Sequence, residues 1–155
     1  MSQHQATVAW AGPESDEFLR GHYSRVHDIS FDGGAVLQGS AAPTAVRAPW
    51  SSEAAIDPEE LFIASLSSCH MLWFLDFARR AKVAVRGYRD EAVGDLAKTE
   101  DGRIAMTRVV LRPRVDCDAD EETLEHLHHQ AHEACFIANS VKTEVLVEPR
   151  HGGNN

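Results

Sequence analysis

The feature that most constrains the fold is one long apolar helix that begins near Asp57. Asp57 is predicted to be its N-cap, Pro58 occupies the first helical position, and Glu60 completes a capping box. From Leu61 to Leu75 nearly every side of the helix is apolar, which is typical of a helix surrounded by protein. This run of about 15 residues is short for a membrane span, which needs about 20. We therefore expect a central helix that runs to about Lys82.

Hydrophobic patterns on both sides of this helix predict strands. Residues 22–31 alternate between apolar and polar, and Asp32-Gly33-Gly34 then turns the chain into a returning strand. In chain order, the predicted elements are strands at 6–11, 22–31 and 35–38, a loop at 39–56, the central helix, strands at 84–96 and 103–116, a helix from Asp118 or Asp120 to Cys135, and a strand at 141–147. This order predicts an α+β fold with helices packed on antiparallel sheet.

Length and charge limit the classes of function. The 155 residues fit one domain, which we expect to cover residues 1–150 and to be followed by a flexible tail at 151–155. The formal charge of −9 disfavours binding to the phosphates of nucleic acids or to anionic membranes. Residues 1–5 lack the basic and apolar segments of a secretion signal, so we expect a cytoplasmic location.

Three cysteines are too few, and odd in number, for the disulfide scaffold of a secreted domain. Cys69 lies in the apolar helix and Cys135 ends the second helix, and each alone is typical of a small buried hydrophobe. Both lie on faces that must pack into one core, where two thiols can form a reversible disulfide. Cys117 is flanked by Asp116 and Asp118, whose charges should disfavour its thiolate, and we interpret it as incidental.

Two segments together resemble the OsmC/Ohr family. The stretch from Asp57 to His70 is similar to the acidic Pro-Glu-x-Leu-Phe helix that leads to the reactive cysteine of that family. The spacing of ten residues from Glu59 to Cys69 matches the same pattern. The sequence His132-Glu133-Ala134-Cys135, followed by a short polar loop and a strand, resembles the segment with the resolving cysteine. With the order of elements, the similarity covers nearly the whole chain.

The resemblance implies a cofactor-free thiol peroxidase, a homodimer of two intertwined α+β subunits that reduces small organic hydroperoxides. The electrons would come from an external dithiol such as a lipoylated protein. By the same resemblance, Cys69 would be the peroxidatic cysteine, Cys135 the resolving cysteine, and Glu59 the carboxylate that orients an active-site arginine. Arg25 is favoured for that arginine, because it alternates with apolar residues on a face expected to point inward. Arg47, the alternative, has the pattern of a solvated loop charge.

Helix geometry adds a condition to this assignment. Ten helical residues at a rise of about 1.5 Å separate Glu59 from Cys69 by about 15 Å. The two side chains cannot meet within one straight helix. We therefore expect an isologous dimer whose central helices pack antiparallel, so that Glu59 of one subunit lies near Cys69 of the other.

Two positions depart from the family pattern. His70 follows Cys69 where better-known members have Phe, and Phe136 follows Cys135 where many have Pro. His70 lies about 100° around the helix from Cys69, and we expect it to have a structural role. A pocket for the organic substrate could be lined by apolar side chains near the cysteines, namely Phe62, Leu66, Trp73 and Phe136.

Two rival functions remain open from the sequence. A histidine cluster lies in the second helix, made up of His126, His128, His129 and His132. Of these, His128 and His132 share a face with Cys135 at spacings that could hold zinc, although a solvated polar stripe has the same pattern. The fold could also serve as a non-catalytic binding module for a small molecule, since a fold alone does not fix a function.

Overall fold

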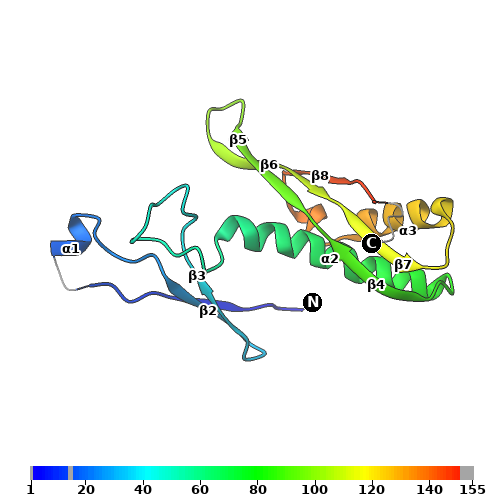
Figure 1. The fold of residues 1–155 in the computed structure, drawn as a ribbon, viewed down its shortest axis with the longest axis horizontal. Helices are drawn as coiled ribbons and strands as arrows, with labels where there is room; N and C mark the ends of the chain where they lie inside the picture. Colours follow the sequence, from blue (N-terminus) through cyan, green and yellow to red (C-terminus); the bar gives the residue numbers. More distant parts are fainter. Residues whose placement is uncertain (1, 14–15, 151–155) are drawn as a thin grey trace. The chain divides into compact units, whose positions relative to one another are not determined.

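The computed structural model describes residues 2–13 and 16–150, and the chain divides into two compact units, Met1–Leu61 and Phe62–Asn155. Helices and paired strands are both present (Figure 1), so the predicted α+β class is confirmed. The single domain over residues 1–150 and the homodimer stay predictions. The predicted tail at residues 151–155 lies outside the described residues.

The first unit is built on a three-stranded antiparallel sheet in the order β1-β2-β3. Its elements are β1 (Ala6–Ala9), helix α1 (Asp16–Leu19), β2 (His27–Phe31) and β3 (Val36–Gly39). Strands β2 and β3 form the predicted hairpin, and Gly34 in its turn has a φ of 88°, which glycine adopts without strain. The strand predicted from residue 22 was placed too early. The backbone N–H of Arg25 donates to the carbonyl of Trp50 in the following loop, and the ladder of β2 starts only at His27.

Helix α2 (Pro58–Arg80) is the predicted central helix. Its capping box is formed as expected: the Asp57 carboxylate accepts from the backbone N–H of Glu60 at 2.7 Å, and the Glu60 carboxylate accepts from the N–H of Asp57 at 3.0 Å. The prediction that protein surrounds the helix holds for one face only. The buried residues form a stripe at every fourth position, consisting of Leu66, His70, Phe74 and Ala78, whereas Leu72 is 61% exposed in this chain.

By length and composition, α2 is also apolar enough to cross a membrane. One such helix is weak evidence, because the core helix of a compact domain has the same length and composition. The buried stripe of α2 packs on the sheets and the other long helix of the second unit. We therefore treat α2 as the core helix of that unit.

The second unit combines two small sheets with helix α3 (Glu121–Ala134). One sheet pairs β4 (Val85–Asp90) with β7 (Pro113–Cys117), and the other has the order β5-β6-β8, with β5 (Val93–Lys98), β6 (Ile104–Leu111) and β8 (Glu144–Val147). The carboxylate of Asp120 accepts from the backbone N–H of Thr123 at 2.9 Å, so Asp120 rather than Asp118 is the N-cap of α3.

Three strand predictions needed correction in this unit. The two long runs at 84–96 and 103–116 are each divided between the two sheets, because the Asp90 carboxylate accepts the backbone N–H of Arg112 at 2.6 Å and both strands break there. Pro113, which has no N–H to donate, begins β7 after the break. The last strand pairs with β6 in parallel, not antiparallel, although the other strand pairs are antiparallel.

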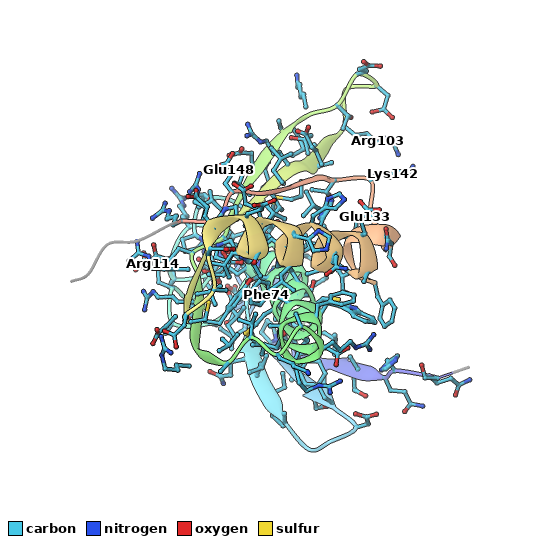
Figure 2. The ribbon with its side chains drawn as sticks, turned by 90° about the vertical axis from the view of Figure 1, so that its right-hand side faces the viewer. Phe74, Arg103, Arg114, Glu133, Lys142 and Glu148 are labelled. Carbon is cyan, nitrogen blue, oxygen red and sulfur yellow. The ribbon has the colours of Figure 1, made fainter. Side chains whose placement is uncertain are left out.

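Two clusters of buried side chains fix α2 in the second unit. One joins Phe74 and Ala78 of α2 to Leu127 and Ala131 of α3, and the other joins Leu66 to β6. Figure 2 shows Phe74 in the interior between the helices, whereas charged side chains such as Arg103 and Glu148 lie at the periphery. The middle of α2, with Cys69, and the end of α3, with Cys135, are thereby held in one core.

Candidate functional site

The Cys69 thiol lies near enough to the Cys135 thiol within the second unit to raise its pKa. Cys69 lies on α2, whereas Cys135 is the C-cap of α3 and is buried. Both cysteines are free, so no disulfide joins them. Two thiols that touch across a helix pair can form a disulfide when one of them is oxidised. The structure therefore brings together the two cysteines that the sequence pointed to.

The surroundings of Cys135 hold it in the protonated form. Burial, with a smaller contribution from the Cys69 thiol, raises the pKa of its thiol to about 11. The backbone N–H groups of Ala138 and Ile137 act in the opposite direction, and the N–H of Ala138 donates to the sulfur at 3.4 Å. At neutral pH, Cys135 is therefore a thiol with a proton to give, not a thiolate.

Aromatic side chains lie beside this pair. Trp73 follows Cys69 by one helical turn, and its ring meets that of Phe136 edge to face at 5.2 Å between centroids. Phe136 is exposed in this chain, as is Leu72. The other two predicted pocket residues behave differently, because Leu66 is fully buried and Phe62 packs against it near β6. The predicted apolar pocket is therefore divided into two pairs, Phe62 with Leu66 and Trp73 with Phe136.

His70, one residue after Cys69, has the structural role that we expected. Its Nε2 lies 3.1 Å from Nδ1 of His128 on α3, and both rings are buried. The ring planes differ by only 9° with centroids 5.4 Å apart, which places the rings edge to edge with one N–H pointing at the other nitrogen. Burial, with smaller contributions from His128 and His132, lowers the pKa of His70 to about 3, so His70 is neutral at pH 7.

The proposed carboxylate and arginine lie in the first unit, whereas both cysteines lie in the second. Glu59 is half-buried in the first turn of α2. The Nη1 of Arg25 donates to the carbonyls of Gly21 at 3.0 Å and Tyr23 at 2.6 Å, and among the described residues no ion pair joins Arg25 to Glu59. Arg47 is exposed in its loop, as its pattern predicted.

Comparison with known proteins places this arrangement in a family. The OsmC-like protein family matches residues 51–150, which include both cysteines. The chain belongs to the OsmC-like family. A search of curated proteins found no match. Among solved structures, an OsmC-like protein of unknown function from Vibrio cholerae is 48% identical, with a TM-score of 0.92, over 97% of this chain and 100% of that chain.

Two more distant structures show the same fold. The organic hydroperoxide resistance protein OhrB of Bacillus subtilis is 22% identical to this OsmC-like protein, with a TM-score of 0.71 over 96% of this chain and 98% of that chain. An organic hydroperoxide resistance protein OsmC from Legionella pneumophila is 19% identical, with a TM-score of 0.69 and 96% of each chain covered. At these identities the likeness establishes the fold.

The histidine cluster does not form the zinc site that the helical spacing allowed. Among the residues that the structure describes, no group of three or more His, Cys, Asp or Glu side chains is placed to hold a metal ion. His128 meets His70 instead.

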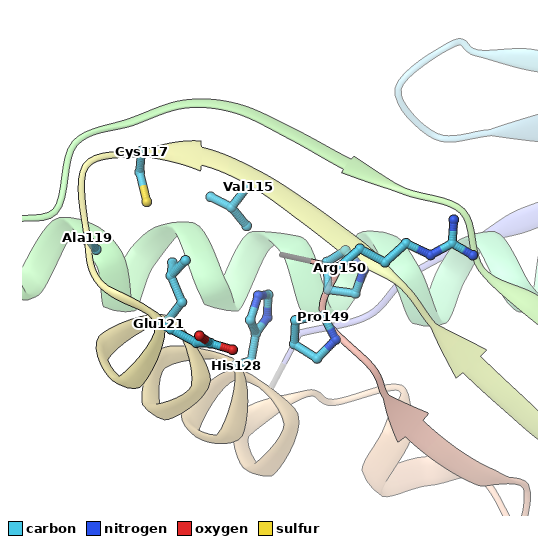
Figure 3. Close-up of a pocket in the computed structure, with 9 residues that line it drawn as sticks. Val115, Cys117, Ala119, Glu121, His128, Pro149 and Arg150 are labelled. Atoms are coloured by element: carbon cyan, nitrogen blue, oxygen red, sulfur yellow. The ribbon is translucent and has the colours of Figure 1, made fainter. Parts of the chain in front are cut away.

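The interpretation of Cys117 from the sequence did not include Arg86, because only the fold places Arg86 beside Asp116 and Asp118. The guanidinium of Arg86 on β4 donates to the carboxylates of Asp116 and Asp118, each at 2.8 Å, and holds the pKa of Asp118 below its usual range. The charges beside Cys117 are therefore paired. In Figure 3 the sulfur of Cys117 faces α3 across a recess of about 300 Å³ whose polar lining is Glu121, His128 and Arg150. No sequence signal links Arg86 to residues that lie 30 and 32 positions away.

Proposed function

We propose that this OsmC-like protein is a thiol peroxidase that reduces small organic hydroperoxides. The observation that carries the proposal is that the free thiols of Cys69 and Cys135, supplied by different helices, lie near enough for one to raise the pKa of the other. The names of the distant relatives from Bacillus subtilis and Legionella pneumophila, both organic hydroperoxide resistance proteins, favour the same chemistry. Cys69, the less buried of the two, is the proposed site of attack.

The proposed reaction consists of one oxidation and two exchanges. The Cys69 thiolate attacks the distal oxygen of ROOH, the O–O bond breaks, and RO⁻ takes a proton and leaves as ROH. Cys69 is now a sulfenic acid. The Cys135 thiol condenses with it, so that an S–S bond forms and the sulfenic hydroxyl leaves with the thiol proton as water. An external dithiol, such as a lipoylated protein, then reduces the disulfide by thiol–disulfide exchange and is itself oxidised.

The same proposal includes the homodimer and the roles of Glu59 and Arg25. A thiolate on an apolar helix needs a nearby cation, since burial alone raises the pKa of a thiol. Arg25 supports this role because none of the described carboxylates pairs with it, so its charge is available. Glu59 is proposed to orient Arg25, with each copy completing the thiol site of the other. Sedimentation showing only monomers at the concentration of the activity assay would contradict this part.

The central test follows peroxide consumption and intact mass together. Wild-type protein with cumene hydroperoxide and dihydrolipoamide should consume peroxide, and without the dithiol it should lose two hydrogens to a Cys69–Cys135 disulfide. Cys69→Ser should be inactive, and Cys135→Ser should accumulate a Cys69 sulfenic acid that dimedone traps. The matched control is Cys117→Ser, which should behave as the wild type. A wild-type protein that neither consumes peroxide nor forms the disulfide would overturn the proposal.

A further inference from the structure

Backbone N–H groups from the turn that follows Cys135 point at its sulfur. The N–H of Ala138 donates to Sγ at 3.4 Å, and the N–H of Ile137 likewise acts to lower the pKa of this thiol, although burial outweighs both. Cys135 is only 1% exposed. A negative charge on its sulfur therefore depends on donors from the protein rather than on water.

Asn139 fastens this turn, which includes the short 3₁₀ helix Ala138–Ser140, to the end of α3. Its side-chain Nδ2 donates to the carbonyl of Glu133 at 2.9 Å, and its backbone N–H donates to the carbonyl of Cys135 at 3.0 Å. Glu133 lies in the last turn of α3, where carbonyl groups have no partner within the helix. Asn139 therefore supplies a partner to this carbonyl and holds the adjoining residue, Ala138, beside the sulfur.

The proposed reaction places negative charge on Cys135 at two steps. Cys135 attacks the Cys69 sulfenic acid as a thiolate, because the thiolate is the nucleophilic form. When the external dithiol later attacks the sulfur of Cys69, the less buried of the two, the S–S bond breaks and Cys135 leaves as a thiolate that then takes a proton. An N–H that is already aimed at the sulfur stabilises this charge without rearrangement at the moment of reaction.

We propose that Asn139 is a positioning residue, which holds the N–H of Ala138 on the Cys135 sulfur while Cys135 attacks the Cys69 sulfenic acid. In that step the S–S bond forms, the S–O bond of the sulfenic acid breaks, and the hydroxyl leaves with the thiol proton as water. The inference rests on the proposed peroxidase function and adds to it a residue that acts through the backbone of the following turn.

The test separates the attack on peroxide from the attack by Cys135. Reduced protein receives one equivalent of cumene hydroperoxide, peroxide loss gives the rate of the first step, and quenching with dimedone at increasing times gives the lifetime of the Cys69 sulfenic acid. Asn139→Ala should consume peroxide at the wild-type rate but keep the sulfenic acid about fivefold longer. Asn139→Gln, which keeps an amide donor on a longer side chain, should restore part of the rate.

Ser140→Ala is the matched control, because the hydroxyl of Ser140 donates to the carbonyl of Phe136 at 2.6 Å within the same turn and does not join the turn to Glu133. This variant also loses one side-chain hydrogen bond, so a merely structural role would slow the second step equally in both variants. The proposal predicts that Ser140→Ala keeps a sulfenic acid lifetime within about twofold of the wild type.

The N–H of Ala138 can also be removed by itself. A synthetic segment of residues 135–155 is ligated through Cys135 to recombinant residues 1–134, with lactic acid in place of Ala138, so that an ester replaces one amide of the full chain. This protein should keep the sulfenic acid about tenfold longer than a ligated all-amide chain.

Two results overturn the inference while leaving the peroxidase proposal intact: a wild-type lifetime in Asn139→Ala and in the ester protein, or equal slowing in Asn139→Ala and Ser140→Ala. A wild type that consumes no peroxide and forms no disulfide overturns the proposed function, and this inference with it.

Discussion

Two neighbouring residues of α2 face polar partners from α3 and its C-cap, and the two pairs differ in burial and in the chemistry open to them. The Cys69 thiol lies near enough to Cys135 to raise its pKa, and the next residue, His70, is hydrogen-bonded to His128. Cys69 is only half-buried, so one member of the thiol pair can be reached by a reagent, whereas both imidazoles are enclosed. The thiol contact can be converted to a covalent bond. The imidazole contact needs a ring nitrogen without a proton to accept the hydrogen bond, and His70 stays uncharged at neutral pH because burial lowers its pKa to about 3.

The comparison indicates a division of roles along a single helix. A pair of thiols gives up two electrons when it forms a disulfide, and this requires the second thiol to be held at a fixed place on another element. The buried imidazole pair supplies part of that fixation, since one N–H links α2 to α3 one residue away from the sulfur. Four predictions test this division, in order of decreasing effect.

The largest effect should follow from Phe74→Ala. Phe74 is fully buried and its ring lies 4.3 Å from that of His128, so its removal opens a cavity beside the imidazole contact. We expect a loss of about 3–5 kcal/mol in the free energy of unfolding, measured by chemical denaturation. Phe31→Ala removes the same side chain from a more exposed position and should cost clearly less. Equal losses in the two variants would show that α2 and α3 are not held together at Phe74.

Oxidation of the thiol contact should stabilise the protein by about 2–4 kcal/mol, because a disulfide constrains the unfolded chain. The measurement is urea denaturation of oxidised and reduced protein at one pH. Cys117→Ser should keep the gain, and Cys135→Ser should lose it. If the oxidised wild type is no more stable than the reduced form, then forming the disulfide disrupts the packing around the two cysteines by as much as it stabilises the protein.

Acid should weaken the imidazole contact and leave the thiol contact chemically unchanged. The pKa of His70 is lowered from 6.5 to about 3 in the folded protein, so the unfolded chain binds a proton first. Stability is therefore fully present above pH 6.5 and falls as the pH drops towards 3, by about 2 kcal/mol at pH 5. Thermal unfolding across this range measures the slope. A stability that is flat between pH 7 and pH 5 would contradict the buried neutral pair.

The smallest effect should follow from His70→Phe, which replaces the imidazole with an apolar ring. The variant loses one buried hydrogen bond but gains apolar surface, for a net loss of about 1 kcal/mol at pH 7. Its stability should fall less steeply in acid than that of the wild type. His70→Gln can still donate to His128 and serves as the control at pH 7. A steeper acid slope in His70→Phe would show that another group carries the pH dependence.

Local rules predicted the elements that depend on neighbouring residues. The capping box at Asp57 and Glu60, the hairpin turn at Gly34 and the helix start at Asp120 each involve groups within three residues of one another. Hydrophobic periodicity also put Cys69 and Cys135 on core-facing surfaces, and the structure brings their thiols together. The predictions that failed involve contacts between distant residues, such as the break between β6 and β7 that Asp90 makes at Arg112.

Arg25 shows the same limit at the candidate site. Alternation predicted a buried arginine on a strand face, but the residue lies in a loop, where its partners are Tyr23 and two carbonyls. The pattern was misleading because alternation records only side-chain polarity, whereas a strand also needs a neighbour for its backbone. The backbone N–H of Arg25 has its partner in the loop at Trp50.

By itself, the sequence determined the α+β class, the long apolar helix and the identity of the two cysteines, because these depend on caps, periodicity and motifs a few residues long. Only the tertiary structure decided which side chains share an environment. It paired His70 with His128 across 58 residues, Arg86 with Asp116 on the neighbouring strand and with Asp118 just after that strand, and Arg25 with the ring of Tyr23. The reason is physical: hydrogen bonds and ion pairs act over a few ångströms, and the folded backbone sets which residues come that close.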